Sequence, residues 1–322
     1  MNKGKKVVYY ICDNHDWGYV SYLVWDILKE EGYLNSTVDF TFAGREVYKY
    51  TDERENEYYF VPTDIALCRD YPKYLPNMNK HFADFDMSGM VTWHEGQNAP
   101  EKVITVHTIG DVNSGSYGPA NPLYNHNLMW AMNKLRKEVG LDDFSIVTEA
   151  THWSGVYEGE GDPTLLLQYP VPMVDIEVGS ETESWSNKDA ARVLALSLLH
   201  IFDEEVNIYN LLCVGGVHFD PNFAEAVHTS WNDEQDFFGV SHIMANQWLV
   251  SGEYEGEKGI EMASRCIDSI IGGIDAIVFH DKLKGCYKDV VRSLGEKYNV
   301  PILKHQALRK PETINWSNGA TA

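Results

Sequence analysis

Residues 275–304, DAIVFHDKLKGCYKDVVRSLGEKYNVPILK, decide the fold class, because they predict a strand, a helix and a second strand in succession. The apolar runs 275–280 and 301–304 are as short as buried strands, and residues 285–298 between them follow a helical pattern. Two strands joined through a helix pair in parallel, and helices then cover both faces of the sheet. The segment therefore predicts an α/β protein.

The same alternation extends upstream through most of the chain. Strands are predicted at 7–12, 38–42, 58–61, 103–107, 145–151, 171–178, 210–214 and 238–244, and helices at 19–31, 121–139, 187–202 and 258–272. Residues 62–97 are rich in Pro, Asn, Asp and Gly and are predicted to be loops. We expect a mostly parallel, twisted sheet with helices on both faces. It would form a single compact unit over 1–310, or two closely packed subdomains of about 1–140 and 141–310, followed by a disordered tail at 311–322.

Composition restricts the class of protein further. The 322 residues are 44% hydrophobic, which is enough for a sizeable core, and no apolar run is long enough to predict a membrane span or a signal peptide. Five cysteines stand singly without a C-x-x-C pair, which favours a reduced cytoplasmic location. The net charge of −22 gives no general support for binding nucleic acid, and DNA is not an expected partner.

One segment departs from this acidic character. Between Lys282 and Lys310 there are eight Lys or Arg residues against two acids. This segment is either a local basic patch or the solvated face of a C-terminal helix and its flanks, and the second interpretation is the more ordinary one.

Histidines and acids recur where the predicted strands end. His107, Glu177, His218 and His242 occupy such positions, as does the run 149–152, EATH. Ligands of open α/β sheets bind beyond the carboxyl ends of the strands, so these groups are expected to converge. Together they can bind a metal that activates water, or act directly as general base and oxyanion stabiliser. For any one of them, a hydrogen-bonded core imidazole is the alternative, and the sequence has no H-x-x-x-H spacing to specify a metal.

Other catalytic signatures are absent from the sequence. There is no G-x-S-x-G elbow, Walker A loop or G-x-G-x-x-G, so a serine nucleophile and a nucleotide phosphate site are not indicated. Gly215-Gly216 follows an apolar strand and predicts either an oxyanion-binding pair of amides or a tight turn.

Three segments in order resemble the signature blocks of the archaeal and plant type of D-aminoacyl-tRNA deacylase: 148–152 (TEATH), 177–185 (EVGSETESW) and 215–223 (GGVHFDPNF). Shorter similar pieces contain His94, His107 and His242, so the resemblance spans about residues 5 to 305. It implies a phosphorylase or peptidyl-tRNA hydrolase type of fold, hydrolysis of the ester between a D-amino acid and tRNA, and zinc as the metal.

The chain departs from that family pattern at the site blocks. Trp153 stands where the family has a second histidine, Val217 replaces a glycine, Asp111 replaces an asparagine and Ser241 replaces a glycine. Retained scaffold with an altered site suggests a diverged substrate, since function resides in the site. The alternatives are therefore an esterase or amidase acting on a small amino-acid or peptide derivative, and a binding protein without catalysis.

Roles for individual residues complete the expectation. Glu149 or His152 would activate water, and His218 would face the oxyanion. The substrate would contact Thr151, Trp153, Glu177, Gly215 and Gly216, and a metal would be bound by His94, His107, His152 and His242. Trp153 would stack on an adenine or on an aromatic substrate, or would instead fill core space.

Overall fold

The computed structural model describes residues 4–96, 99–158, 161–203 and 206–316 and divides them into two compact units. Unit 1 comprises residues 1–106, 127–146 and 153–204, and unit 2 comprises 107–126, 147–152 and 205–322. The chain therefore passes between the units five times, and neither unit is a continuous half of the sequence. In the described part of the chain, no helix has the length and apolar character needed to cross a membrane.

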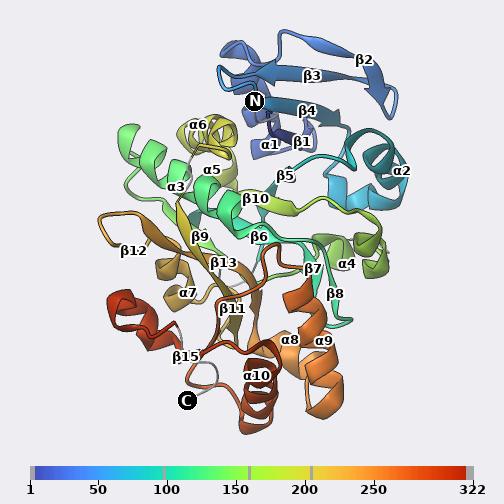
Figure 1. The fold of residues 1–322 in the computed structure, drawn as a ribbon. Helices are drawn as coiled ribbons and strands as arrows, with labels where there is room; N and C mark the ends of the chain where they lie inside the picture. The colour runs from blue at the N-terminus through green and yellow to red at the C-terminus, as the bar shows by residue number, and fades with distance from the viewer. Residues whose placement is uncertain (1–3, 97–98, 159–160, 204–205, 317–322) are drawn as a thin grey trace. The chain divides into compact units, whose positions relative to one another are not determined.

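Unit 1 is built on an eight-stranded sheet in the order β2-β3-β4-β1-β5-β10-β6-β9 (Figure 1). Its four central strands pair in parallel: β1 (Lys6–Cys12), β4 (Glu57–Thr63), β5 (Met87–His94) and β10 (Met173–Ser180). Two antiparallel strands, β2 (Thr37–Phe42) and β3 (Arg45–Thr51), extend the sheet beyond β4. At the other side, β6 (Lys102–Thr108) and β9 (Ser145–Thr148) both run from unit 1 residues into unit 2 residues.

Helices accompany this sheet as the alternation predicts. They are α1 (Val20–Glu30), α2 (Tyr71–Phe82), α3 (Pro122–Glu138), α4 (Ser154–Glu158), α5 (Thr182–Trp185) and α6 (Lys188–Ser197), with short 3₁₀ turns η1 (Leu67–Asp70), η2 (Pro163–Gln168) and η3 (Leu198–His200). α1 packs against α6 and β1. The Asn187 side chain caps α6 by accepting from the amides of Asp189 and Ala190.

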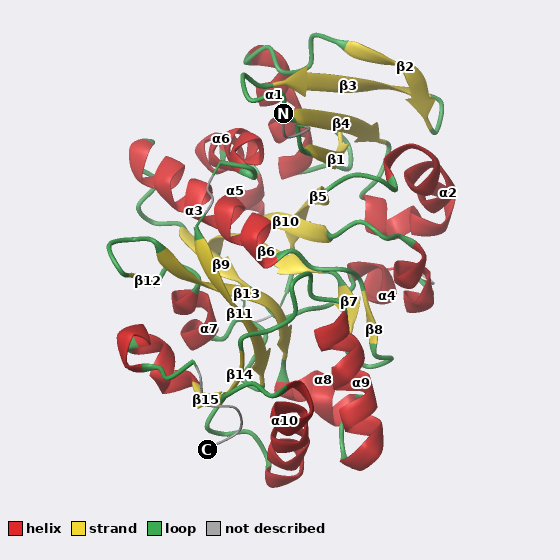
Figure 2. Cartoon of the chain, viewed as in Figure 1, coloured by secondary structure: helices red, strands yellow, loops and turns green. Residues whose placement is uncertain are grey.

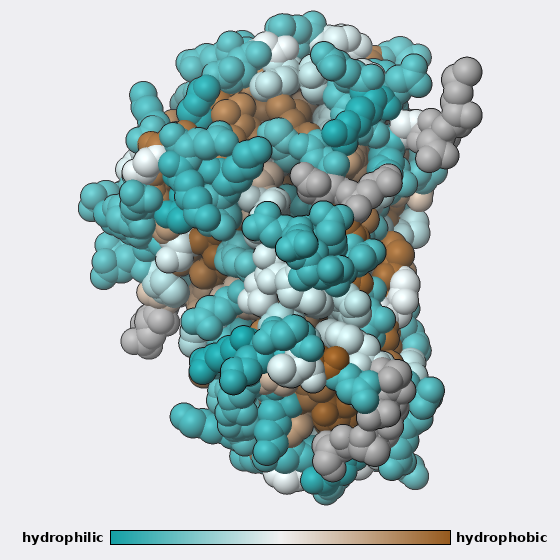
Figure 3. Space-filling view, turned by 60° about the vertical axis from the view of Figure 1, so that its left-hand side comes forward, coloured by the Kyte–Doolittle hydropathy of each residue, from teal (hydrophilic) through white to brown (hydrophobic). Residues whose placement is uncertain are grey.

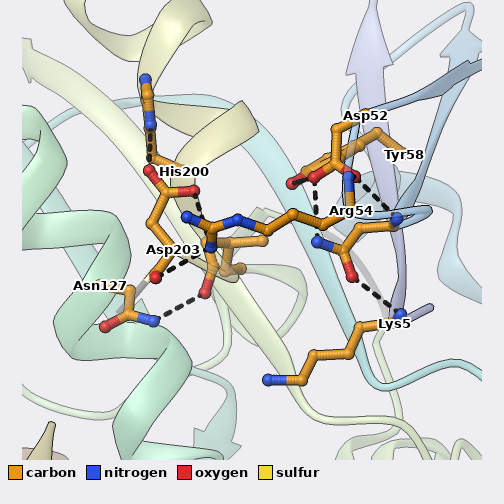
Figure 4. Close-up of polar contacts among 9 residues, drawn as sticks. Lys5, Asp52, Arg54, Tyr58, Asn127, His200 and Asp203 are labelled. Atoms are coloured by element: carbon orange, nitrogen blue, oxygen red, sulfur yellow. Dashed lines mark hydrogen bonds and ion pairs between the residues drawn. The ribbon is translucent and has the colours of Figure 1, made fainter. Parts of the chain in front are cut away.

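A polar network fixes one turn of the sheet in unit 1 (Figure 4). The Arg54 guanidinium, from the β3–β4 turn, donates to the Asp203 carbonyl at 3.1 Å, and His200 lies 2.6 Å from the Asp203 carboxylate. Asn127 of α3 donates to the Ile201 carbonyl at 3.0 Å. These bonds join the turn and α3 to the segment that follows α6.

Unit 2 contains a five-stranded sheet in the order β12-β13-β11-β14-β15 (Figure 2). Four strands are parallel: β11 (Asn207–Val214), β13 (Asp236–Met244), β14 (Ala276–Phe279) and β15 (Ile302–Lys304). β12 (Ser230–Trp231) pairs antiparallel at the edge, and β7 (Gly110–Asp111) with β8 (Ser116–Tyr117) forms a small ribbon. The helices are α7 (Pro221–Ala226), α8 (Asn246–Ser251), α9 (Gly256–Asp268) and α10 (Gly285–Tyr298). Because the four strands are parallel, their carboxyl ends lie at one edge of the sheet, where ligand sites of such sheets form.

The α/β class with a mostly parallel sheet is thus confirmed, and the strand–helix–strand of 275–304 is β14, α10 and β15. The loop prediction for 62–97 is wrong, because this segment holds α2 and the central strand β5. Pro76 lies inside α2. Because proline normally breaks a helix, the sequence pattern did not predict a helix here. β5 is buried along its whole length, so it shows no alternation of polar and apolar residues.

The prediction of a disordered tail over 311–322 is wrong for residues 311–316. Pro311–Thr313 form the 3₁₀ turn η5, and the Trp316 ring packs against Tyr209 at a centroid distance of 4.3 Å. Residues 317–322 lie outside the described residues. Figure 3 shows hydrophilic residues over most of the face drawn.

Candidate functional site

A carboxylate and an imidazole are joined in unit 2 where β9 and β11 end. The Glu149 side chain is fully buried, and its Oε2 lies 2.7 Å from Nε2 of His218, whose side chain is 30% exposed. The Ala150 amide donates to the His218 carbonyl at 2.9 Å, so the two loops are also fastened through the backbone. With the proton on Nε2, the imidazole carries its basic lone pair on Nδ1. The arrangement is that of a general base oriented by a carboxylate.

Two further imidazoles pack beside this pair in unit 2. The rings of His107 and His152 are stacked at a centroid distance of 3.9 Å, and His152 meets His218 edge to face at 4.9 Å. The Trp248 ring lies within 5.8 Å of the His152 ring and 5.3 Å of the His218 ring. The structure thus brings together four residues that the sequence singled out, namely Glu149, His218, His107 and His152.

The protonation of the stacked pair follows from its surroundings. Burial lowers the pKa of His152 well below the usual value, and the neighbouring His107 lowers that pKa further. The Nδ1 atom of His152 lies 2.9 Å from the Ala150 carbonyl, and that of His107 lies 3.1 Å from the Thr108 carbonyl. A carbonyl accepts only, so each Nδ1 carries the proton and each Nε2 carries a lone pair. In this tautomer a neutral ring presents Nε2 to a cation, whereas the lowered pKa of His152 disfavours uptake of a proton.

His242, a predicted metal ligand, is instead held by hydroxyls. Its ring is fully buried, with Nδ1 at 2.9 Å from Thr108 Oγ1 and 3.1 Å from Thr151 Oγ1. Its Nε2 lies 3.1 Å from Ser269 Oγ. Burial lowers the pKa of His242 to about 3, so the ring is neutral at neutral pH. These contacts occupy both nitrogens and make His242 a structural residue of unit 2, because a metal ligand needs one nitrogen for the metal.

Thr151 belongs to the same buried network. It is fully buried, and its hydroxyl also accepts from the Ile243 amide at 3.0 Å, which ties the segment after β9 to β13. The predicted substrate contact at Thr151 is therefore corrected to a structural role.

Gly215-Gly216 form a tight turn after β11. Their φ angles are +95° and +76°, a region that favours glycine. The Gly215 amide donates to the Met244 carbonyl at 2.9 Å, and the Gly216 carbonyl accepts from Asn246. Of the two amides predicted to bind an oxyanion, that of Gly215 is not available, since it already donates to the Met244 carbonyl.

The remaining predicted site residues lie in unit 1. His94 at the end of β5 has its Nδ1 at 2.9 Å from Ser180 Oγ. Trp153 is 1% exposed and packs edge to face on Tyr71 at 5.0 Å. Trp153 therefore fills the core, which corrects its assignment as a substrate contact. The family pattern could not predict whether the Trp153 side chain points into the core or towards the substrate, because a tryptophan in a loop can do either.

Glu177 takes part in a cluster that the sequence predicted only partly. The Thr92 hydroxyl lies 2.5 Å from Asp175 Oδ1 and 3.2 Å from Glu177 Oε1, and all three side chains are buried. Thr92 and Asp175 were missed as site candidates. The available signal was the spacing of Asp175 and Glu177, which places both carboxylates on the same face of β10.

A family model described as D-aminoacyl-tRNA deacylase matches residues 81–303. The chain belongs to the D-aminoacyl-tRNA deacylase family. The matched region contains Glu149, His152 and His218, so the site described above lies within the part of the chain that defines the family.

Individual relatives agree with this family membership. A D-aminoacyl-tRNA deacylase of Archaeoglobus fulgidus is 22% identical over 282 residues, covering 84% of this chain and 89% of the relative. One of Methanococcus maripaludis is 23% identical, over 44% of this chain and 59% of the relative. A solved crystal structure of a conserved protein of unknown function superposes with a TM-score of 0.73 at 21% identity, covering 96% of this chain and 98% of that one. That likeness shows that the two chains share a fold.

Proposed function

We propose that this protein is a cytoplasmic hydrolase that cleaves the ester joining a D-amino acid to tRNA. The observation that carries the proposal is the buried Glu149 carboxylate bonded to the partly exposed His218 imidazole, within the region that matches the deacylase family. A buried carboxylate orients the imidazole and stabilises the imidazolium that forms when the ring takes up a proton.

The reaction needs one proton transfer in each direction. His218 Nδ1 takes a proton from a water molecule as the water oxygen bonds to the ester carbonyl carbon. The bond from that carbon to the ribose oxygen then breaks, and the proton passes from the imidazolium to the ribose oxygen. The products are the free D-amino acid and tRNA. The His152 imidazole, which burial keeps uncharged at neutral pH, adjoins the base and adds no competing positive charge.

The proposal includes zinc, because two histidines beside the Glu149–His218 pair have the orientation of metal ligands. His107 and His152 each have Nδ1 at a backbone carbonyl and a lone pair on Nε2, which is how metal-bound histidines are usually oriented. These two residues would hold the ion. When bound, zinc would lower the pKa of a coordinated water. The predicted ligand His94 belongs to unit 1, and His242 is set aside because hydroxyls bind both of its nitrogens.

The test is hydrolysis of D-tyrosyl-tRNA and L-tyrosyl-tRNA by the full chain, with and without a chelator. We expect turnover of the D-ester only, and a loss in kcat of about 100-fold to 10,000-fold in Glu149→Gln. Glu261→Gln is the matched control, because this exposed glutamate on α9 pairs only with Arg265 among the described residues and should leave kcat unchanged.

Four outcomes would overturn parts of this proposal. Absence of hydrolysis of either tRNA ester, with turnover of D-tyrosine methyl ester, would favour the small-substrate hydrolase. Absence of all hydrolysis would favour a binding protein. Chelator-resistant activity would remove zinc, and full activity of Glu149→Gln would remove the role of Glu149 in orienting and stabilising the His218 base.

A further inference from the structure

A hollow of about 370 Å³ lies in unit 2 between α10 and the ends of β14 and β15, and it shares no residue with the Glu149–His218 pair. Its lining combines an apolar floor with charged walls and consists of Phe279, Asp281, Lys288, Val291, Arg292, Ile302 and Lys304. Three cations from two separate elements thus meet around one concave surface. For these three residues the convergence favours the local basic patch over a solvated helix face, because Lys304 comes from a strand and not from the helix.

The geometry directs these cations to the same place. Lys288 and Arg292 are four residues apart on α10, so they lie on one face of the helix. Lys288 lies over the Phe279 ring at 5.6 Å and donates to the Asp281 carbonyl at 3.2 Å, which positions its ammonium beside β14. Lys304 is exposed at the end of β15.

The positive charges of the hollow are only partly neutralised by acids of its own lining. The Lys304 side chain makes no hydrogen bond or ion pair with any residue that the structure describes. Arg292 contacts Asp289 at 2.5 Å, on its own helix and at the surface, where ion pairs are weak. Asp281 is the one acid of the lining, and the Gln306 amide donates to its carboxylate. This hydrogen bond lowers the pKa of Asp281, so the hollow carries three positive charges and one negative charge at neutral pH.

A concentrated positive charge is unusual on this chain. The net charge is −22, whereas residues 282–310 hold eight Lys or Arg against two acids. Polyanions approach a protein where its local potential is positive, and an acidic remainder confines them to that place. Lysine and arginine at a groove bind phosphates of the nucleic-acid backbone without reading the sequence.

We propose that this hollow, which we call the groove from here on, binds the phosphodiester backbone of the tRNA substrate through Lys288, Arg292 and Lys304. The proposal rests on the proposed function for the identity of the RNA. The groove supplies affinity and register, while the ester is cleaved at the Glu149–His218 pair.

The test compares two variants that each remove two positive charges from unit 2. Arg292→Gln/Lys304→Gln alters the groove, and Lys258→Gln/Arg265→Gln is the control, because these exposed residues of α9 pair with Glu253 and Glu261 and do not line the hollow. The Kd for fluorescently labelled, uncharged tRNA is measured by anisotropy from 50 to 300 mM NaCl. The KM and kcat for D-tyrosyl-tRNA, and kcat/KM for D-tyrosyl-adenosine, which has no phosphate, are measured in parallel.

We expect the groove variant to bind tRNA about 10-fold more weakly at 50 mM NaCl and to lower the salt slope by about 1 to 2, because up to two phosphate contacts are lost. Its KM for D-tyrosyl-tRNA rises, and its activity on D-tyrosyl-adenosine stays unchanged. The control variant keeps the parent Kd and slope. Equal Kd and slope in both variants would overturn the groove, even where D-tyrosyl-tRNA is hydrolysed.

Two further outcomes separate the groove from the proposed function and from a simpler ligand. Weaker tRNA binding by the groove variant, in a protein that hydrolyses no aminoacyl ester, would support the groove and overturn the proposed function alone. Stabilisation by inorganic phosphate in the melting curve, lost in the groove variant while its tRNA affinity stays unchanged, would overturn the RNA proposal and assign a free-phosphate site.

Discussion

Acidification should destabilise this protein through the neutral, buried ring of His242. The folded state holds the pKa of this histidine at about 3, whereas an unfolded chain has a histidine pKa near 6.5. Below about pH 6.5 the unfolded state therefore takes up a proton that the folded state refuses. Stability is complete above pH 6.5 and falls as the pH decreases towards 3, which is the sign for a histidine whose folded pKa is lowered.

The size of the effect follows from the two pKa values. A pH of 5 is about 1.5 units below the pKa of the imidazole in the unfolded chain, whereas the folded ring is still neutral at this pH. The free energy of unfolding therefore falls by about 2 kcal/mol relative to pH 7.5. Other buried histidines add to the total loss, and His126, with its pKa lowered by burial to about 4, is one of them. A comparison of variants is needed to isolate the share of His242.

Urea unfolding followed by circular dichroism at pH 7.5 and pH 5.0 measures that share. His242→Gln keeps an acceptor and a donor for the surrounding hydroxyls but does not titrate, so its loss of stability on acidification should be about 2 kcal/mol smaller than that of the parent. His15→Gln, at an exposed histidine, should behave as the parent. Should His242→Gln fail to fold, NMR of the parent ring serves instead. Equal acid losses in parent and variant, or titration of the ring near pH 6.5, would refute the reasoning.

Three other perturbations test the site and its support. Glu149→Gln and His218→Asn should each lower kcat by about 100-fold to 10,000-fold. Because the pair acts as a unit, the single-turnover rate of the double variant should be little lower than that of either single variant. Losses that multiply in the double variant would contradict this. Gly216→Ala places a Cβ 2.3 Å from a carboxylate oxygen at a φ of +76°, and it should lower the free energy of unfolding in urea by about 1–3 kcal/mol. The control Gly44→Ala has a similar φ but open space around the Cβ, so its loss should be smaller. Trp153→Ala should cost about 3–5 kcal/mol in the same assay and leave the KM for D-tyrosyl-tRNA unchanged; a raised KM at full stability would show that the ring meets the substrate.

Local pattern was sufficient for most of the elements. The segment 275–304 and the apolar runs upstream determined most of the parallel strands, because a buried parallel strand must be short and apolar whatever surrounds it. Pattern failed at α2, where Pro76 sits inside a helix whose stability comes from its packed face, and at β5, which is buried on both sides. The strand ends likewise gave Glu149 and His218, since parallel strands present their carboxyl ends at one edge.

The sequence by itself thus determined the α/β class, the family and the histidines and acids at the strand ends. Only the tertiary structure decided which of these groups have their atoms turned to one another. Hydroxyls contact both ring nitrogens of His242, and Trp153 points into the core. Lys304 of β15 lines the same hollow as Lys288 and Arg292 of α10. The physical reason is that spacing along the chain fixes which residues share an element, whereas side-chain direction and the partners of each polar atom depend on contacts between elements distant in sequence.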